Sequence, residues 1–487
     1  MTPPPPVTGQ AAAGRDTAVL LKNATVVDTR DGTLAPGTDV LIRADRIVDV
    51  RPGIVVTDGP EPFTVDARGK YVVPGYADMH AHPLGQRPEE EARDLELLLA
   101  HGVTGFRQMS GSLALLEKRA SGTLGLPAAS PELLALPGPL LLTPVNAATG
   151  EQAVAAVREQ HAAGADFIKA AMVTPEVFFA AQAEALRLGL PIVGHLPVGI
   201  DVPKASRIGM KSIEHLGPGV GLFACCSTDG AHVHANAAGQ PAMKVPPFKL
   251  PFMERVMERV VKKLVINPIN RTKPADIENL RLAVRTFDDD LAAELAERFV
   301  ADGTWQVPTL IRVKTQELCD DPAFANDPDL RYMGEATVRS WKAAARKFTA
   351  FPAEARETFR AVYRRQLELT KLFDDAGVPM LVGSDCSGAA WVVPGASLHH
   401  EFDELARAGL TPLRVLQMTT LRAAEFLDAT DTMGTVEPGR RADLVLLDAD
   451  PVERVEHLHR IAGVVRAGQH YGAAELDALK ERVAARA

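Results

Sequence analysis

A recurring order of helix, glycine and apolar strand runs through the middle of this chain and limits the folds that it can adopt. Four examples are HAAGADFIK, LRLGLPIV, SRIGMKSIEH and DDAGVPMLVG. Glycine suits the position just after a helix because it adopts a left-handed backbone without a Cβ clash. With the apolar run YADMHAH as the first strand, the chain has about eight strand–helix units. This pattern predicts an α/β fold, a (β/α)8 TIM-like barrel.

The two ends of the chain differ from the middle. Residues 17–74 alternate short β-rich runs with turns, and a matching set returns in residues 430–475. Such runs are typical of short antiparallel strands. Because chain ends often lie close together, both sets predict one small β-sandwich domain, with the barrel over residues 75–429. Residues 1–16 are rich in Pro, Ala and Gly, and we expect a disordered tail there.

One spacing interrupts the strand–helix rhythm. Between His215 and Trp305 the chain is far longer than a single barrel unit, so residues 217–300 are predicted to be an insertion. It begins with a Gly/Ala/Asn-rich loop that contains Cys225-Cys226, and it continues with helical segments such as PFMERVMERVVKKL. A second helix-rich excess covers roughly residues 318–365. Loops at the carboxyl ends of barrel strands surround the active site, so both predict a lid or a substrate wall.

Composition excludes several classes of protein. A net charge of −9 and a pI near 5.9 argue against a nucleic-acid-binding protein. No apolar stretch approaches the roughly 18 residues that a membrane span needs, and the N-terminus lacks the features of a secretory signal. The four cysteines form no C-x-x-C pair, which argues against a zinc ribbon and a thioredoxin-type motif, and four thiols in so long a chain argue against a disulfide framework. We expect a cytoplasmic protein with a small-molecule substrate and neither a nucleic-acid nor a membrane partner.

Two histidines at the end of the first predicted strand form a candidate metal half-site. His80 and His82 stand two residues apart, so a strand directs both side chains to the same face. Neutral imidazole nitrogens are good ligands for zinc and related ions. The alternative is a chance pair on the surface. His232 and His234 repeat the H-x-H spacing without a preceding strand, and we expect that pair to lie in a non-ligating loop.

Four further residues end apolar runs in the same way: Lys169, His195, His215 and Asp385. A protonated lysine would repel cations, but carboxylation by CO2 would turn Lys169 into an anionic bridge between two ions. The local sequence alone favours a salt-bridging lysine, and the four histidines and Asp385 favour the bridge instead. His195 and His215 would serve a second ion, although each alone could be a hydrogen-bonded core residue. Asp385 would serve the first ion, and its alternative role is a helix cap.

Charge counting supports two divalent ions at this site. Two ions bring four positive charges, and a carbamate, Asp385 and one bridging hydroxide remove three of them. The remaining positive charge would polarise a carbonyl oxygen as hydroxide attacks. Asp385 would act as general base and then as general acid toward the leaving amine.

These motifs resemble the amidohydrolase superfamily, most closely its prolidase-like and imidazolonepropionase-like branch. The resemblance rests on VVPGYADMHAHP, ADFIKAAM, SIEHLGPG, LVGSD, LHHEFDELARAGLTPLRVLQMTTLRAAEFL and MGTVEPGRRADLVLLDADP. It implies a deformed barrel, a binuclear centre that usually holds zinc, and an N-carboxylated Lys169. It also implies a homo-oligomer. The ligands that the resemblance implies are His80, His82, Lys169, His195, His215 and Asp385.

The expected reaction is hydrolysis of an amide C–N bond in a small molecule such as an N-acyl amino acid or a dipeptide. The same hydroxide could instead open a cyclic amide or imide, or cleave a lactone or ester. A third possibility is an inactive barrel with a structural role, because fold does not guarantee chemistry. Arg107 and Arg312, near strand ends, are candidates for binding a substrate carboxylate, or else form exterior salt bridges. Gln108, where relatives often have an acidic residue, is a third candidate contact.

Overall fold

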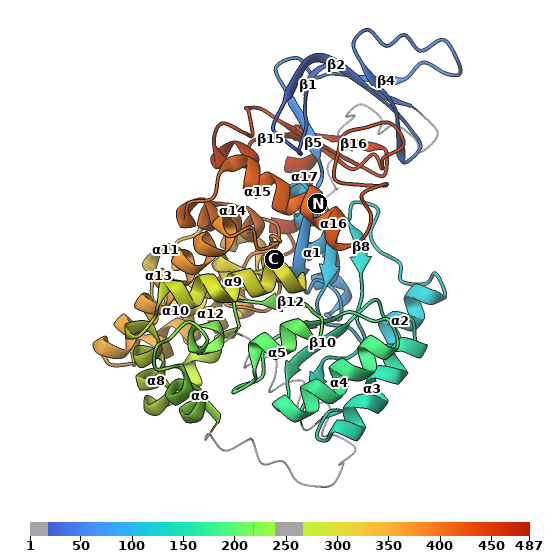
Figure 1. Cartoon of the computed structure of the whole chain (residues 1–487). Coiled ribbons are helices and arrows are strands. Elements are labelled where there is room, and N and C mark those ends of the chain that lie inside the picture. The colour runs from blue at the N-terminus through green and yellow to red at the C-terminus, as the bar shows by residue number, and fades with distance from the viewer. Residues whose placement is uncertain (1–17, 144, 218, 239–265) are drawn as a thin grey trace, which may run out of the picture. The chain divides into compact units, whose positions relative to one another are not determined.

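The computed structural model describes residues 18–143, 145–217, 219–238 and 266–487. The predicted tail at 1–16 and the predicted helical segment at 251–264 lie outside these residues. The chain divides into two compact units (Figure 1). The terminal unit comprises Met1–Tyr76, Leu99–Thr104 and Thr411–Glu481. The central unit comprises Ala77–Leu98, Gly105–Leu410 and Arg482–Ala487.

The terminal unit is built on an eight-stranded sheet with the order β16-β15-β14-β5-β1-β2-β3, and β4 pairs with β1. Its strands are β1 (Val19–Val27), β2 (Leu34–Arg43), β3 (Arg46–Arg51), β4 (Phe63–Asp66), β5 (Tyr71–Pro74), β14 (Leu444–Leu447), β15 (Ile461–Arg466) and β16 (Gln469–Gly472). Both β4 and β5 run parallel to β1, whereas β2 runs antiparallel to it. The sheet is therefore mixed: the predicted antiparallel pairing holds for most of its strand pairs but is wrong for β1 with β4 and β5.

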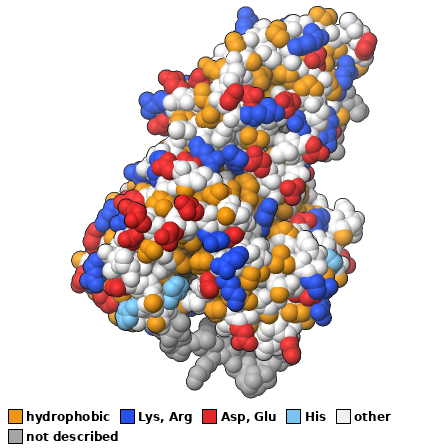
Figure 2. All heavy atoms as spheres, in the orientation of Figure 1, with side chains coloured by type: hydrophobic (Ala, Val, Ile, Leu, Met, Phe, Trp, Pro, Cys, Tyr) orange, Lys and Arg blue, Asp and Glu red, His pale blue; other side chains and the backbone are white. Residues whose placement is uncertain are grey.

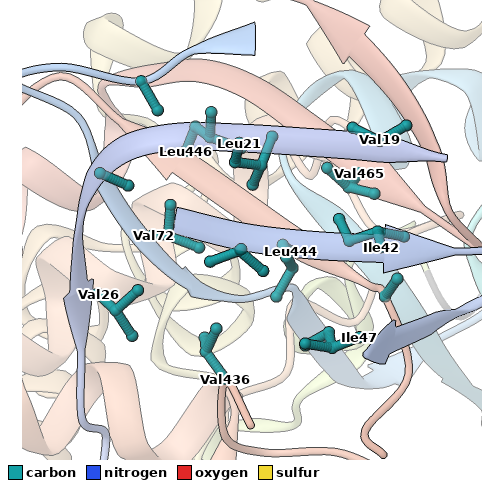
Figure 3. Close-up of a cluster of buried hydrophobic side chains, with 14 residues drawn as sticks. Val19, Leu21, Val26, Ile42, Ile47, Val72, Val436, Leu444, Leu446 and Val465 are labelled. Atoms are coloured by element: carbon teal, nitrogen blue, oxygen red, sulfur yellow. The ribbon is translucent and has the colours of Figure 1, made fainter. Parts of the chain in front are cut away.

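Apolar side chains from both ends of the sequence pack on this sheet (Figure 3). Leu21 and Val72 come from the N-terminal strands, and Leu444 and Val465 come from the C-terminal strands; all four are fully buried. Alternation along each strand directs every second residue into this cluster. Burial of apolar surface thus joins two segments that are far apart in the sequence.

The central unit contains two sheets, ordered β6-β7-β8 and β13-β12-β11-β10-β9. Their strands are β6 (Tyr76–Ala81), β7 (Val103–Gln108), β8 (Glu132–Ala135), β9 (Leu141–Leu142), β10 (Ile168–Met172), β11 (Ile192–Gly194), β12 (Met210–Glu214) and β13 (Trp305–Val307). Neighbouring strands from β9 to β13 are parallel, as are β7 and β8. The predicted α/β class is confirmed.

Residues 378–386 run between the edges of the two sheets. Single parallel bridges join Gln306 to Met380 and Ala81 to Cys386. On the β13 side, the Leu381 amide donates to the carbonyl of Gln306 at 3.0 Å. On the β6 side, the Asp385 amide donates to the carbonyl of His80 at 2.7 Å. This segment carries Asp385 directly to the end of β6.

Helices connect the strands, and their bounds are α1 (Pro88–Ala100), α2 (Leu113–Ala120), α3 (Gly150–Ala162), α4 (Pro175–Arg187), α5 (Val202–Arg207), α6 (Gly230–Ala238), α8 (Pro274–Arg285), α9 (Asp289–Asp302), α10 (Leu310–Glu317), α11 (Pro322–Ala325), α12 (Glu335–Thr349), α13 (Ala353–Asp375), α14 (Ala396–Ala408), α15 (Pro412–Thr419), α16 (Leu421–Phe426) and α17 (Ala473–Ala484). Short 3-10 helices are η1 (Gly221–Ala224), η2 (Pro268–Arg271), η3 (Pro328–Tyr332) and η4 (Val455–His459). The glycines predicted to follow helices all have positive φ, namely Gly164, Gly189, Gly209 and Gly377.

The described parts of the two insertions are helical. His232 and His234 lie on α6 rather than in a loop, so that structural prediction is wrong. Val233 between them is buried, and its carbonyl accepts a hydrogen bond from Asn279 of α8 at 2.9 Å. In the second insertion, Trp341 of α12 is buried against Trp391, with ring centroids 5.8 Å apart.

The surface and the helices add two observations. On the face drawn in Figure 2, acidic and basic side chains are interspersed among apolar ones. Of the helices that the structure describes, none combines the length and apolarity needed to cross a membrane.

Candidate metal centre

Three imidazoles converge on the carboxylate of Asp385. The Nε2 atom of His82 lies 3.0 Å from Oδ1, and that of His80 lies 3.4 Å from the same oxygen. The Nε2 atom of His215 lies 3.9 Å from Oδ2. One ligand atom each from His80, His215 and Asp385 lie within 4.8 Å of one another, so they could hold a metal ion together.

Strand ends bring these residues together, and two glycines permit the close approach. A Cβ on Gly383, two residues before Asp385, would lie 2.5 Å from the Cβ of His80. A Cβ on Gly194, next to His195, would lie 2.1 Å from the backbone oxygen of Ala170. Real Cβ atoms do not come that close, so both positions require glycine. The motifs VGSD and VGH thus have a steric reason for their glycine.

Each imidazole that faces Asp385 has a side-chain partner for its other nitrogen. The Nδ1 atom of His82 lies 2.8 Å from Ser110 Oγ, and that of His215 lies 2.5 Å from Thr309 Oγ1. The Nδ1 atom of His80 lies 2.6 Å from a carboxylate oxygen of Glu214. Such partners fix the ring orientation and the tautomer, so Nε2 is left for a cation.

His195 and Lys169 complete the predicted set. The ring centroid of His195 lies 5.1 Å from that of His215. The Lys169 ammonium is buried, with 2% of the residue exposed, and its Nζ has no hydrogen-bond partner. Burial lowers the pKa of Lys169 to about 8, against the opposing charges of Glu214 and Asp385. A buried nitrogen without a hydrogen-bond partner is the feature expected of a lysine whose Nζ is carboxylated.

Electrostatics favour the protonation states that metal binding needs. Burial, assisted by the charge of Lys169, lowers the pKa of His80 to about 4 and that of His195 to about 3. Burial alone would raise the pKa of Asp385, but the imidazoles around it, His215 first, hold that pKa well below its usual range. Neutral imidazoles and an ionised carboxylate are the forms that bind a metal ion. The donor set therefore fits a divalent cation.

Stability of the metal-free protein is expected to fall on acidification below pH 6.5. An unfolded histidine binds its proton near pH 6.5, whereas folded His80 binds it only near pH 4. The unfolded state therefore takes up more protons in this window, and folding stability decreases as the pH drops. The loss is about 3 kcal/mol for His80 between pH 6.5 and 4, at 1.36 kcal/mol per pKa unit.

This expectation is checked by urea unfolding at several pH values in the presence of a chelator. His232→Gln, which removes an exposed histidine of α6, is the matched control. A free energy of unfolding that stays constant from pH 7 to pH 4 would contradict the expectation.

The predicted substrate contacts have protein partners. The Arg107 guanidinium is buried; its Nε donates to the Met79 carbonyl at 2.6 Å, and its Nη2 lies 3.0 Å from Glu214. Gln108 Oε1 accepts a hydrogen bond from the Leu84 amide, and Gln108 Nε2 donates one to the Leu84 carbonyl, each at 3.2 Å. These contacts favour structural roles for both side chains, and their substrate contacts stay predictions.

Arg312 lies beside the candidate ligands. Its Nε lies 3.0 Å from Asp385 Oδ2, and its side chain is nearly fully buried. Its substrate role also stays a prediction. Glu214 was missed by sequence reasoning, although a carboxylate inside the apolar run KSIEH is a signal that could have identified it.

Comparison with known proteins supports the predicted family resemblance. A profile described as "Amidohydrolase family" matches residues 353–470, a segment that contains Asp385. A solved structure titled "AH, Bottromycin amidohydrolase" is similar over 97% of this chain and 91% of that chain, with 25% identity and a TM-score of 0.68. Residues 353–470 thus match the amidohydrolase family, and the whole chain resembles a solved amidohydrolase. The predicted resemblance and the predicted enzyme class, amidohydrolase, are confirmed at this level.

Other relatives match this chain over shorter segments or at lower identity. An adenine deaminase of Rubrobacter xylanophilus is 36% identical over 64 residues, which is 13% of this chain and 11% of the relative. An imidazolonepropionase of Thermoplasma volcanium is 30% identical over 112 residues, 23% of this chain and 27% of the relative. The match thus spans about a quarter or less of these relatives. A Xaa-Pro dipeptidase structure with bound methionine shares the fold at 18% identity and a TM-score of 0.58, over 94% of this chain and all of that one.

Proposed function

We propose that this amidohydrolase is a metal-dependent enzyme that hydrolyses an amide C–N bond in a small molecule such as an N-acyl amino acid or a dipeptide. One observation carries the proposal: three imidazoles present Nε2 to the buried carboxylate of Asp385 while their Nδ1 atoms have other partners. The names of similar proteins, which include an amidohydrolase and a dipeptidase, support this reaction class.

The proposed scaffold is one (β/α)8 barrel made from both sheets of the central unit. Residues 378–386 would be its last strand, since they bond β13 on one side and β6 on the other. At the other edge, the Asp166 amide donates to the carbonyl of Leu136 at 3.0 Å, which links the end of β8 to the chain that enters β10. In such barrels the active site lies at the carboxyl ends of the strands, where the candidate ligands occur.

The proposed cofactor is a pair of divalent ions, with zinc favoured by the imidazole and carboxylate donors. The first ion would be held by His80, His82 and Asp385, the second by His195 and His215, with N-carboxylated Lys169 between them. When bound, the ions would polarise the substrate carbonyl and lower the pKa of water.

The residues of the chain would manage the proton. Asp385 would accept a proton from the attacking water at a carboxylate oxygen and return it to the leaving nitrogen. The water oxygen then bonds the acyl carbon, the C–N bond breaks, and an acid and an amine result. Arg312, 3.0 Å from Oδ2, would hold the carboxylate in place during these transfers.

A second candidate is hydrolysis of a cyclic amide, imide or lactone by the same groups, which the similarity to an imidazolonepropionase favours. A third, from another class, is an inactive barrel with a structural role. The unpartnered Lys169 argues for the active alternatives. The proposal also includes a small-molecule substrate, a homo-oligomeric state and a cytoplasmic location. It includes a small β-sandwich domain from both chain ends, and neither a nucleic-acid nor a membrane partner.

Metal analysis and a substrate screen test the proposal together. The protein, produced with added zinc, is expected to contain about two equivalents and to hydrolyse linear amides among N-acyl amino acids, dipeptides, cyclic imides and lactones. Turnover confined to cyclic substrates or lactones would favour the second candidate. One equivalent would mean a mononuclear centre. A protein that takes up no metal and cleaves none of these compounds would leave the structural role.

A further inference from the structure

We infer that Glu214 and Arg107 form a buried positioning pair that holds His80 in the orientation needed to bind its cation. The inference rests on the proposed metal centre and concerns residues outside the ligand set. It gives a role to one carboxylate and one guanidinium that are both almost completely shielded from solvent, with side-chain exposures of 0% and 1%.

Both carboxylate oxygens of Glu214 have partners. Oε2 lies 2.6 Å from His80 Nδ1. Oε1 accepts hydrogen bonds from Arg107 Nη2 at 3.0 Å and from Ser212 Oγ at 2.7 Å. With one oxygen anchored by two donors, the other oxygen has a fixed position, and so has the imidazole that bonds it.

Arg107 also holds the backbone beside the ligand. Its Nε donates to the carbonyl of Met79 at 2.6 Å, and Met79 directly precedes His80. A closed ring of contacts therefore runs from the Met79–His80 backbone through the imidazole to Glu214, then through Arg107 back to Met79. Its members come from β6, β7 and β12, so the ring ties three strands to one ligand.

His80 differs in this respect from the other imidazoles that face Asp385. His82 and His215 have hydroxyl partners at Nδ1, whereas His80 has a carboxylate. A carboxylate partner raises ligand basicity as well as fixing the tautomer. The positive charge of Arg107 balances that of Glu214, so the pair strengthens one ligand without changing the net charge beside the ions.

Because the charges of Glu214 and Arg107 offset each other, single and double variants of the pair are expected to differ. Glu214→Gln removes the carboxylate and leaves the buried charge of Arg107 without its Glu214 partner. Arg107→Met leaves the Glu214 charge without its cationic partner and leaves Ser212 as the remaining donor to Oε1. The double variant removes both charges, and loss of a whole buried pair is often tolerated better than loss of one partner.

The experiment measures how tightly the protein holds its metal and how the metal is coordinated, rather than only the rate of hydrolysis. Zinc release from the loaded full-length protein to a colorimetric chelator, and the visible spectrum of the cobalt(II)-substituted protein, are recorded for the wild type and these variants. Glu214→Gln is expected to release one equivalent about 10- to 100-fold faster and to alter the cobalt bands. Glu214→Asp should recover part of this effect, and the double variant should be less impaired than the sum of the single variants.

Ser110→Ala, which removes the hydroxyl partner of His82, is the matched control and should have the smaller effect. Release rates for Glu214→Gln within twofold of wild type, with unchanged cobalt bands, would overturn the inference alone. A wild-type protein that takes up no metal would overturn the proposed centre and this inference with it. If a single variant fails to fold, as judged by thermal unfolding without metal, the double variant decides: wild-type release and spectrum would refute the pair.

Discussion

Asp385→Asn is expected to lower kcat/KM by about 10²- to 10⁴-fold, the usual contribution of a general acid–base group. The Asp385 carboxylate lies within 3.9 Å of the Nε2 atoms of three histidines and of the Nε atom of Arg312. Asparagine nearly preserves its shape but cannot take a proton and binds a cation weakly. No other described carboxylate has this set of imidazole neighbours.

Steady-state kinetics on the best substrate of the screen, with metal analysis of the same samples, checks this result. Asp375→Asn, which neutralises an exposed aspartate of α13, is the matched control and should keep full activity. Full metal content with low activity would identify a lost proton transfer, whereas loss of metal would identify a lost ligand. Activity within tenfold of wild type would contradict the assigned role.

Much of the candidate centre could be predicted because parallel strands obey simple rules. Alternation directs His80 to one face of β6, and the carboxyl ends of neighbouring parallel strands meet at one edge. Asp385 could be assigned to that edge from the apolar run before it, and the structure brings it next to His80. The glycines after helices were predictable for a similar reason, since left-handed backbone favours glycine.

Long-range pairing could not be predicted in the same way. The parallel pairing of β1 with β4 and β5 depends on which edges meet in the folded sheet, and no local pattern encodes that choice. Helix α6 was expected to be a loop because its surroundings are rich in Gly, Ala and Asn, but its own sequence has four alanines, which favour a helix, and it packs against α8.

Glu214 shows the same limit within the site. Its role depends on Arg107 and His80, which are more than one hundred residues away in the sequence. Because Arg107 is a cationic side chain near the end of a strand, the sequence predicts a substrate carboxylate as one possible partner for it. The folded chain supplies a carboxylate of its own instead.

Lys169→Ala is expected to reduce bound metal from two equivalents toward one or none and to lower hydrolysis by at least about 100-fold. The Lys169 Nζ is buried without a hydrogen-bond partner, and burial lowers its pKa to about 8, so part of the amine is neutral near physiological pH. A neutral amine adds to CO2 and loses a proton, which gives an anionic carbamate. Alanine removes this bridge and the negative charge that would offset two cations.

Elemental analysis and ¹³C NMR after incubation with ¹³C-bicarbonate check the two parts of this prediction. The wild type is expected to show a carbamate resonance that Lys169→Ala lacks, and Lys118→Ala, which removes an exposed lysine of α2, should retain both the resonance and the metal. Loss of metal in Lys169→Ala without any carbamate signal in the wild type would mean that the unmodified amine supports the site. Both ions and full activity in Lys169→Ala would refute a bridging role, because an alanine offers no donor atom to either ion.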